Sequence, residues 1–465
     1  MVSTHFLSRH NIGMLSTATA LLSFASPTAL FSTLIFATHG HAFAAPSAFT
    51  KPSNHPYTST ATTKKSTSLS SQCLPDDYPN LNLITPALAA IRKAAKITTC
   101  LQPTTSLSKI SGITKTDTSP VTIGDFAAQA IVLNLLDKEL EEGEDVFIAE
   151  ESSQNLDEDL SLEILRVFQQ VGLNGIIDNE EDLKRSIDLG QTYGSNGQLN
   201  DSVRKRMQEP GLTTRVWCLD PIDGTRGFLR GKQDGGQYCI ALALIEDGVP
   251  IMGILGCPNL PTDAGDENYA WGDDETGKER GCIFVASRGG GCYQLPLYAA
   301  SGDDGDTTGA QKVQVTGNDG GADSLSLEEA RFCIGVEKYG DPEGKVTAIA
   351  KKIHGRLDDD GDILFTRRMD SQVKYGVVAR GGSEFITRLP KKEYHEWIWD
   401  HACGKIIIEE AGGMQTDTDG NLIDYGLGAK MDKDVDGILI SAGGVYHEAI
   451  LNAYKEQEAE RPSST

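Results

Sequence analysis

Acidic residues are distributed very unevenly along this chain, and the distribution limits where a folded core can lie. No Asp or Glu occurs before Asp76, and all 66 acidic residues of the 465-residue chain follow. Such an abrupt shift in charge marks the boundary between a leader and the folded protein. At roughly 100–200 residues per domain, the remainder has room for two domains, which we place at 76–315 and 316–465.

The leader itself has two parts. Residues 12–36 are mostly apolar and small, follow Arg9, and precede small residues that end at Ala42, a pattern typical of a signal peptide. The next stretch, 43–75, is rich in Ser and Thr and contains lysines but no acid, which is transit-peptide composition. We therefore expect a signal peptide up to Ala42, a transit-peptide-like segment after it, and no stable membrane insertion after processing. A membrane anchor is the alternative for 12–36.

The junction between these two parts carries a short motif. It reads Ala-Phe-Ala-Ala-Pro at 42–46 and resembles the bipartite plastid presequences of algae with complex plastids, in which a Phe follows the signal cleavage site. The resemblance implies delivery to a plastid. The secretory pathway or another organelle is the alternative.

Composition and charge narrow the class of protein. With 39% hydrophobic and 23% charged residues, the chain has the composition of an ordinary globular protein. Its formal charge of -24 repels polyanions, so we expect no nucleic-acid partner. The nine cysteines include no CxxC pair, so we interpret most of them as reduced core thiols and not as zinc ligands.

Hydrophobic patterning predicts layered sheets and helices. Strands alternate with helices and with several hairpins, which favours mixed sheets packed between helices over an all-parallel sheet. Short apolar runs at 146–149 and 216–219 predict buried strands, and 375–379 is also expected to be a strand. Residues 155–212, with helical segments at 160–171 and 181–189 and a polar stretch near 190–200, are expected to be a surface insertion.

The segment DPIDGT at 220–225 follows one of these strands and carries the strongest chemical signal. Its two carboxylates, three residues apart across a Pro-shaped turn, can converge together with the Ile222 carbonyl, and such hard oxygen donors suit Mg²⁺. The amides of Gly224 and Thr225, at an expected helix start, would then hold a phosphate. The alternative is an ordinary Asp-Gly turn at the surface.

Three further segments place carboxylates where an expected element begins or ends. Glu150 and Glu151 follow the strand at 146–149. Asp400 is expected to be the N-cap of an apolar helix, and capping is compatible with binding a metal. Asp125 is the first acid of another expected helix and could orient a water as a general base; helix capping is its alternative role.

In this order, these segments resemble the lithium-sensitive, magnesium-dependent phosphatase superfamily that includes inositol monophosphatase. Within it, the chain is similar to the 3'(2'),5'-bisphosphate nucleotidases, over about residues 80–455. The stretches that carry the resemblance are AEES at 149–152, DPIDGT at 220–225, WDHACGKIIIEEAGG at 399–413, DTSPVTIGDFAAQ at 117–129, WCLDPIDGTRGFLRG at 217–231, residues 237–260 and DSQVKY at 370–375.

The resemblance implies a fold and an activity. The fold would be an inositol monophosphatase-like α+β and α/β layered sandwich, with an N-terminal α+β metal-binding domain with insertions, a C-terminal α/β substrate-binding domain, and the active site between them. The activity would be magnesium-dependent removal of the 3'-phosphate of 3'-phosphoadenosine 5'-phosphate, giving AMP and phosphate, and action on the corresponding phosphosulfate. Such an enzyme belongs to sulfur metabolism and is sensitive to lithium.

The resemblance also implies a role for each matching residue. Two or three Mg²⁺ ions would be held by Glu150, Asp220, Asp223, Asp400 and the carbonyl of Ile222. The attacking water would be activated by Asp125 and Thr225, and Glu151 would lie behind the ligands. The substrate would be contacted by Gly224 and Thr225 at the scissile phosphate and by Ser371, Lys374 and Arg388 at the rest of the nucleotide.

One stretch departs from the family pattern and leaves other substrates open. Where the nucleotidases carry an HSxH-like segment, residues 339–345 read YGDPEGK, and Asp341 and Glu343 would oppose an anionic nucleotide. Milder departures are Ala149, where a Gly is usual, and Cys403, where an Ala is usual. An inositol phosphate, inositol polyphosphate or sugar phosphatase is therefore the alternative enzyme. A noncatalytic metal- or nucleotide-binding redox sensor is the alternative of another class. The oligomeric state is not predicted.

Overall fold

The structure is a computed structural model, and it describes most of the chain after the leader. The described residues are 72–103, 113–114, 120–140, 145–207, 215–263, 280–299, 301–302, 304–317, 325–336, 344–391 and 394–460. All of them belong to one unit, Ser66–Thr465. The predicted signal peptide and all but the last four residues of the transit-peptide-like segment lie outside the described residues. None of the described helices combines the length and apolar character needed to cross a membrane.

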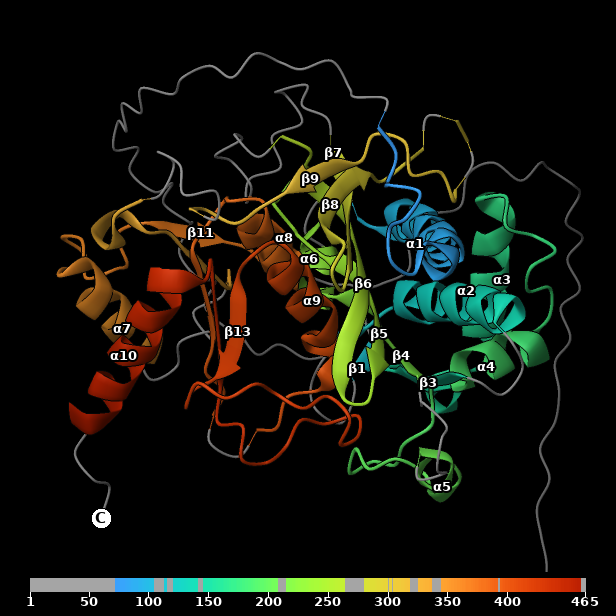
Figure 1. The fold of residues 1–465 in the computed structure, drawn as a ribbon. Helices are drawn as coiled ribbons and strands as arrows, with labels where there is room; N and C mark the ends of the chain where they lie inside the picture. Colours follow the sequence, from blue (N-terminus) through green and yellow to red (C-terminus); the bar gives the residue numbers. More distant parts are fainter. Residues whose placement is uncertain are drawn as a thin grey trace, which may run out of the picture. The chain divides into compact units, whose positions relative to one another are not determined.

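The largest sheet among the described residues has seven strands (Figure 1). The first two strands in its order are parallel, and every later neighbouring pair is antiparallel. In order across the sheet the strands are β3 (Asp145–Ala149), β4 (Arg215–Asp223), β5 (Cys239–Glu246), β6 (Val249–Pro261), β7 (Arg280–Ser287), β8 (Gly291–Pro296) and β9 (Gln311–Val313). The strands predicted at 146–149 and 216–219 are confirmed, and β4 continues four residues further than predicted.

Both faces of the large sheet are buried, because alternate residues of each strand enter different cores. On β3, Val146 and Ile148 face one core and Phe147 and Ala149 face the other. The second core is closed by helices packed on that face: α1 (Leu81–Leu101), α2 (Ile123–Glu139), α3 (Glu158–Gln170) and α4 (Glu180–Asp188). This two-sided burial explains why these strands are nearly continuous apolar runs in the sequence.

A five-stranded sheet forms from the later part of the chain. Its order is β11 (Thr366–Arg368), β10 (Phe332–Ile334), β12 (Phe385–Arg388), β14 (Ile438–Ser441) and β13 (Met414–Asp417). The first three strands are parallel to one another, and β14 is antiparallel to both of its neighbours. The carboxyl ends of β10, β11 and β12 therefore meet at one edge of the sheet.

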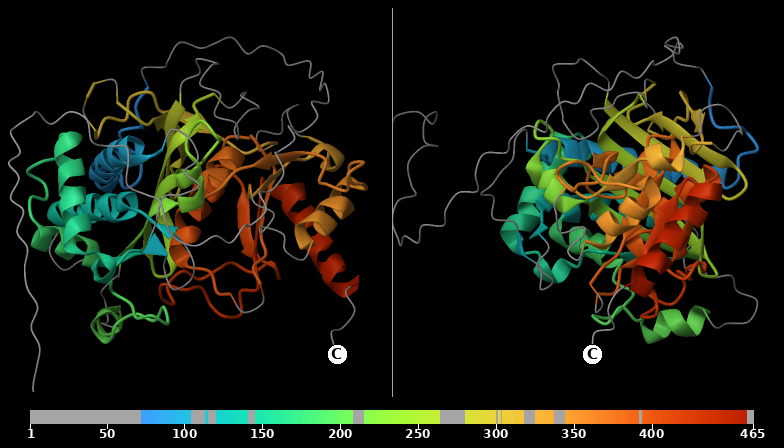
Figure 2. Two further views of the ribbon diagram at one scale, coloured as in Figure 1. Left: turned by 180° about the vertical axis from the view of Figure 1, so that it is seen from behind. Right: turned by 90° about the vertical axis from the view of Figure 1, so that its left-hand side faces the viewer.

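Two helices lie between the sheets, so the molecule is layered as predicted. α9 (Ala402–Glu410) contacts β6 and β7 of the large sheet and β13 of the small one, and α8 (Val373–Ala379) packs beside it (Figure 1). The outer face of the small sheet carries α7 (Lys345–His354) and α10 (Gly444–Glu460). Figure 2 shows the same succession from behind, from the blue and teal helices to the red ones. The division into two domains near residue 315 stays a prediction.

The remaining elements are short. They are β1 (Ile113–Thr114), β2 (Pro120–Val121), α5 (Asp201–Met207), α6 (Thr225–Arg230) and the 3₁₀ turns η1 (Ser153–Asn155), η3 (Leu327–Glu329) and η5 (Ile398–Asp400).

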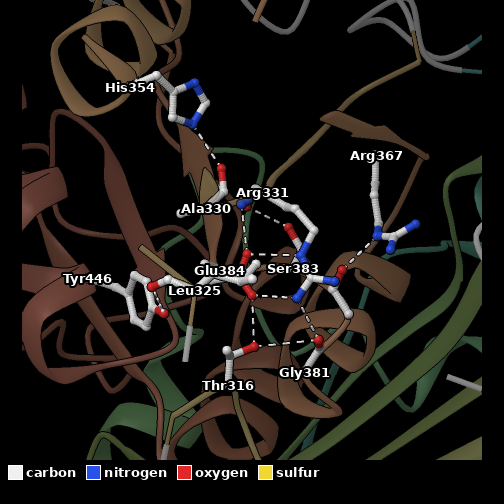
Figure 3. Close-up of polar contacts among 11 residues, drawn as sticks. Thr316, Leu325, Ala330, Arg331, His354, Arg367, Gly381, Ser383, Glu384 and Tyr446 are labelled. Atoms are coloured by element: carbon white, nitrogen blue, oxygen red, sulfur yellow. Dashed lines mark hydrogen bonds and ion pairs between the residues drawn. The ribbon is translucent and has the colours of Figure 1, made fainter. Parts of the chain in front are cut away.

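A buried ion pair fixes the amino ends of β10 and β12 (Figure 3). Glu384 is fully buried, and its carboxylate accepts hydrogen bonds from the backbone N–H of Arg331 at 2.6 Å and from its guanidinium Nη2 at 2.5 Å. Thr316 donates its hydroxyl to the same carboxylate at 2.7 Å. The pair therefore joins the segment after β9 to the starts of two parallel strands.

Two predictions about local structure are wrong. Residues 375–379 form part of helix α8 and not a strand: the β-branched residues favour a strand locally, but this segment is enclosed between two sheets that leave it no strand partner. The stretch 155–212 is not a surface insertion throughout, because α3 and α4 bury apolar side chains in the second core. Its polar part near 190–200 is tied down as well, since Ala429 donates its backbone N–H to the Gly197 carbonyl at 2.8 Å. Gly197 fits there because a Cβ would lie 2.7 Å from Cγ of Lys430.

Candidate active site

The site begins at an irregularity in β4. The pairing of β4 with β5 is regular as far as Asp220 and resumes at Asp223, with a shift of register between them. Pro221 has no N–H to give to the ladder, and the N–H of Ile222 turns back to Oδ1 of Asp220 at 3.2 Å. The strand thus bends where the sequence reads DPID, and the bend turns the two carboxylates toward each other.

A third carboxylate joins them from the other end of the chain. Oxygen atoms of Asp220, Asp223 and Asp400 all lie within 4.8 Å of one another. Asp400 ends the 3₁₀ turn η5, and the residue that caps α9 is His401. The prediction that Asp400 is the N-cap is therefore wrong by one residue. The cause is that a 3₁₀ turn precedes the helix and includes Asp400. The Asp400 carboxylate does not cap α9 and instead lies with those of Asp220 and Asp223.

Burial and mutual repulsion make this cluster a poor place for three negative charges. Burial, followed by repulsion from Glu150, Asp223 and Asp400, raises the pKa of Asp220 well above its ordinary value. The pKa of Asp400 is raised well above its ordinary value, first by burial and then by repulsion from neighbouring acids. Burial also raises the pKa of Asp223, although Lys374 partly offsets it. Clustered carboxylate oxygens of this kind fit a hard divalent cation, which would offset the repulsion.

Glu150 and Glu151 stand at the end of β3 beside the cluster. Glu150 is half-buried, and its charge is the largest single repulsion felt by Asp220. Glu151 is buried, and its backbone is fixed by Gln129 of α2. The Gln129 amide donates to the Glu151 carbonyl at 2.6 Å, and the Glu151 N–H donates to Gln129 Oε1 at 2.9 Å. Gln129, which the sequence reasoning missed, therefore holds the strand end that presents Glu150.

Asp125 caps helix α2 and also faces the cluster. The backbone N–H and the hydroxyl of Thr122 donate to Oδ2 of Asp125 at 2.8 and 2.5 Å, which completes a capping box. Asp125 is buried, and its charge contributes to the raised pKa of Asp220. The capping role considered for Asp125 is thus present, and so is its proximity to the carboxylates.

The turn at Gly224 and Thr225 brings the β4 end against the DSQVKY segment. Gly224 has a φ of 89°, and a Cβ there would lie 2.8 Å from Cβ of Ser371, so only glycine fits. The hydroxyl of Thr225 donates to the Ile222 carbonyl at 3.3 Å. The predicted phosphate-contacting turn and Ser371, one of the predicted nucleotide contacts, therefore touch.

A cavity of about 390 Å³ connects the two groups of predicted residues. Asp223 and Asp400 of the carboxylate cluster line it, and so do the three predicted nucleotide contacts, Ser371, Lys374 and Arg388. The cavity opens along the edge of the small sheet where the parallel strands β10, β11 and β12 end. A cavity at the carboxyl ends of parallel strands is a common ligand site in α/β folds.

A buried polar chain supports one wall of this cavity. Tyr375 bonds through its hydroxyl to Nδ1 of His401 at 2.8 Å, and Nε2 of His401 lies 3.4 Å from Glu396. Arg388 donates its Nε to the other oxygen of Glu396 at 2.7 Å. Burial alone would raise the pKa of Glu396, but Arg388 and His401 outweigh it and lower it to about 2.

The sequence reasoning missed Gln372, Tyr375, Glu396 and His401. Three of them directly follow a selected residue in the sequence, and Glu396 lies four residues before Asp400. Nearness in sequence to a selected residue was the signal that could have found them. The stretches that carry Asp117 and most of 339–345, including Asp341 and Glu343, lie outside the described residues.

Comparison with known proteins identifies the family of this chain. The solved structure of CysQ from Bacteroides thetaiotaomicron, described as a bacterial member of the inositol monophosphatase family, aligns with a TM-score of 0.46 and 15% identity over 79% of this chain and 99% of that one. A 3'(2'),5'-bisphosphate nucleotidase of Emericella nidulans is 35% identical over 349 residues, which cover 74% of this chain and 90% of that protein. The corresponding protein of Schizosaccharomyces pombe is 35% identical over 376 residues, covering 78% of this chain and 92% of that protein. Residues 81–459 match the sequence profile of the inositol monophosphatase family, and the chain belongs to that family.

Proposed function

We propose that this protein is a magnesium-dependent 3'(2'),5'-bisphosphate nucleotidase that converts 3'-phosphoadenosine 5'-phosphate and water into AMP and phosphate. The observation that carries the proposal is that one cavity is lined both by Asp223 and Asp400 of the carboxylate cluster and by the basic side chains of Lys374 and Arg388. The relatives named for this activity support the choice of substrate. The corresponding phosphosulfate would occupy the same cavity.

The carboxylate cluster would hold the metal. Magnesium ions, two or three of them, would be bound by the oxygens of Asp220, Asp223, Asp400 and Glu150 and by the carbonyl of Ile222, and would offset the negative charge that develops on the phosphate during displacement. The protein's contribution is the fixed position of these oxygens. The bend in β4, the 3₁₀ turn η5 and the Gln129 clamp each hold one of the contributing segments.

The other site residues would position the substrate and the water. Asp125 would accept a proton from the attacking water, and Thr225 would orient that water beside the bend in β4. The water oxygen forms a new bond to phosphorus as the bond between phosphorus and the ribose 3'-oxygen breaks, and the ribose oxygen takes up a proton from solvent water. Ser371, Lys374 and Arg388, further along the cavity, would hold the remainder of the nucleotide.

The proposal is tested by phosphate release from the full chain with magnesium, using 3'-phosphoadenosine 5'-phosphate and inositol 1-phosphate at equal concentrations. We expect the bisphosphate to be strongly preferred and lithium to inhibit its hydrolysis. Preference for the inositol phosphate would show that the protein is an inositol phosphatase with the same metal-dependent chemistry. Binding without release from either substrate would favour a noncatalytic sensor.

We also propose that the leader directs the protein to a plastid. The support is in the sequence alone: an apolar stretch, a Phe at the junction and an acid-free segment rich in Ser and Thr. A fluorescent protein fused to residues 1–75 should enter the plastid in an alga with complex plastids. Replacement of Phe43 by Ala should leave the fusion outside it, and entry that does not depend on Phe43 would count against the proposal.

A further inference from the structure

The cavity contains a basic residue that the proposed chemistry does not use. The last residues of the three parallel strands, Ile334 of β10, Arg368 of β11 and Arg388 of β12, all line it. Arg368 pairs in register with Ile334 across the sheet, so it stands at the same strand edge as the predicted nucleotide contacts. No motif in the sequence pointed to Arg368.

The direction of the Arg368 side chain follows from its neighbour on the strand. Arg367 donates its Nε to the carbonyl of Gly382 at 2.6 Å (Figure 3), which anchors the face of β11 that Arg367 occupies to the segment before β12. Successive residues of a strand point to opposite faces. Arg368 consequently points away from this anchored face, and it lines the cavity.

The other basic residues of the cavity already have partners. Arg388 is paired with the buried carboxylate of Glu396. Lys374 donates its ammonium to the Ser371 carbonyl at 2.7 Å and also acts on Asp223, whose pKa it lowers against the effect of burial. Within the part of the chain that the structure describes, Arg368 is the cavity-lining Lys or Arg with no hydrogen bond and no ion pair.

An acid shares the cavity with Arg368 but does not neutralise it. Asp362 is exposed and lines the same cavity. Among the described residues it forms no salt bridge with Arg368. A half-buried guanidinium that has no side-chain partner among the described residues is a strong binding group for a phosphate, because its planar N–H groups match two phosphate oxygens at once.

We propose that Arg368 binds the phosphate of the substrate that is not hydrolysed, and that it thereby sets the preference for a bisphosphate over a monophosphate. This inference rests on the proposed function and deepens it. Magnesium held by the carboxylate cluster would bind the phosphate that is hydrolysed, and Arg368 would bind the phosphate that remains on the product. Arg368 is a specificity-determining residue, since it is not among the groups assigned to the bond-breaking step.

The test compares two substrates that differ only in the second phosphate. Initial rates are measured with the full chain on 3'-phosphoadenosine 5'-phosphate and on adenosine 3'-phosphate, for the wild type and for Arg368→Gln. Because a charge-assisted hydrogen-bonded pair is involved, we expect KM for the bisphosphate to rise about 10- to 100-fold. We expect KM for the monophosphate and kcat for both substrates to change less than about twofold.

Two matched variants separate recognition from general charge effects. Arg356→Gln removes the same charge from an exposed residue that does not line the cavity and should leave both substrates unaffected. Asp362→Asn removes an acid from the same cavity and should lower KM for the bisphosphate. An equal loss on both substrates in Arg368→Gln, or no change on either, overturns the inference.

Failure of the proposed function has a different signature. If the wild type releases no phosphate from either substrate, the nucleotidase proposal falls. The role of Arg368 is then decided by equilibrium binding of 3'-phosphoadenosine 5'-phosphate to the full chain in magnesium. Binding at least tenfold weaker in Arg368→Gln than in Arg356→Gln supports it, and equal binding overturns it.

Discussion

The backbone N–H of Gln372 donates a hydrogen bond to Oδ2 of Asp223 at 2.5 Å, although the two residues are 149 positions apart in the sequence. The side chain of Gln372 is also fully used, because its amide donates to the Trp399 carbonyl at 2.8 Å and its oxygen accepts the Gly404 N–H at 3.0 Å. One residue thus holds the bend of β4 and both sides of the turn that carries Asp400. The geometry of the carboxylate cluster depends on it.

Replacement of Gln372 by Ala should therefore loosen the cluster. The change leaves two buried backbone groups without partners, at a cost of about 1–3 kcal/mol each, and we expect the magnesium concentration for half-maximal activity to rise about tenfold. Titration of phosphate release with magnesium measures this. Gln457→Ala, a buried glutamine on α10, is the control, and its magnesium requirement should not change. An unchanged requirement in both variants would remove Gln372 from the site.

Removal of one charge from the cluster should abolish most of the activity. Asp223→Asn keeps the size of the side chain but loses an anionic oxygen, so we expect kcat/KM to fall by at least about 10³ at saturating magnesium. Asp419→Asn, at an exposed turn, should retain full activity. Near-normal turnover in Asp223→Asn would contradict the assignment of the site.

The same cluster should destabilise the fold when no cation is bound. Burial raises the pKa of Asp220 above its ordinary value of 3.8, so between that value and the raised one the folded chain holds a proton that the unfolded chain has lost. Stability therefore decreases as the pH rises through this window, and the full cost remains above it. In EDTA, Asp220→Asn should raise Tm by roughly 1–4 °C at pH 8 and by less at pH 5.

Magnesium should reverse the order of these two proteins. Only the wild type has the full set of oxygens, so saturating magnesium should raise its Tm above that of Asp220→Asn. Differential scanning calorimetry at both pH values, with and without magnesium, gives the four comparisons. A lower Tm for Asp220→Asn in EDTA at pH 8 would show that the three carboxylates are not in conflict.

The ion pair at the amino ends of β10 and β12 is a different kind of constraint. Glu384→Gln leaves the half-buried guanidinium of Arg331 without its counter-charge, which should cost about 1.5–3 kcal/mol of unfolding free energy. Chemical denaturation measures the loss. The double variant Arg331→Met with Glu384→Leu should recover most of it, because it removes the buried carboxylate and its half-buried partner together. Failure of the double variant to recover stability would mean that the hydrogen bonds, and not the charges, carry the effect.

The sequence could predict those features that depend on residues close together in the chain, and not those that depend on tertiary packing. The strand before DPIDGT and the acids at the end of β3 are coded by neighbouring residues, and both are found as predicted. Residues 375–379 of helix α8 were predicted as a strand, since Tyr375, Val377 and Val378 favour one, whereas the surroundings of the helix come from two sheets that are distant in sequence. Arg368 could not be found, because only the pairing of β11 with β10 places it beside the cavity.

The Gln372–Asp223 contact also bears on how the protein is synthesised. Ribosomes synthesise the chain from its amino terminus. Four of the site's acids, Asp125, Glu150, Asp220 and Asp223, therefore emerge long before Asp400. Until the last quarter of the polypeptide has docked, a nascent molecule has acids that repel one another. It lacks Asp400, the third carboxylate of the cluster, and the residues that line the cavity for the nucleotide. Catalytic competence would therefore report the completion of folding, and chains truncated anywhere before α9 should be inert even where their first sheet has formed.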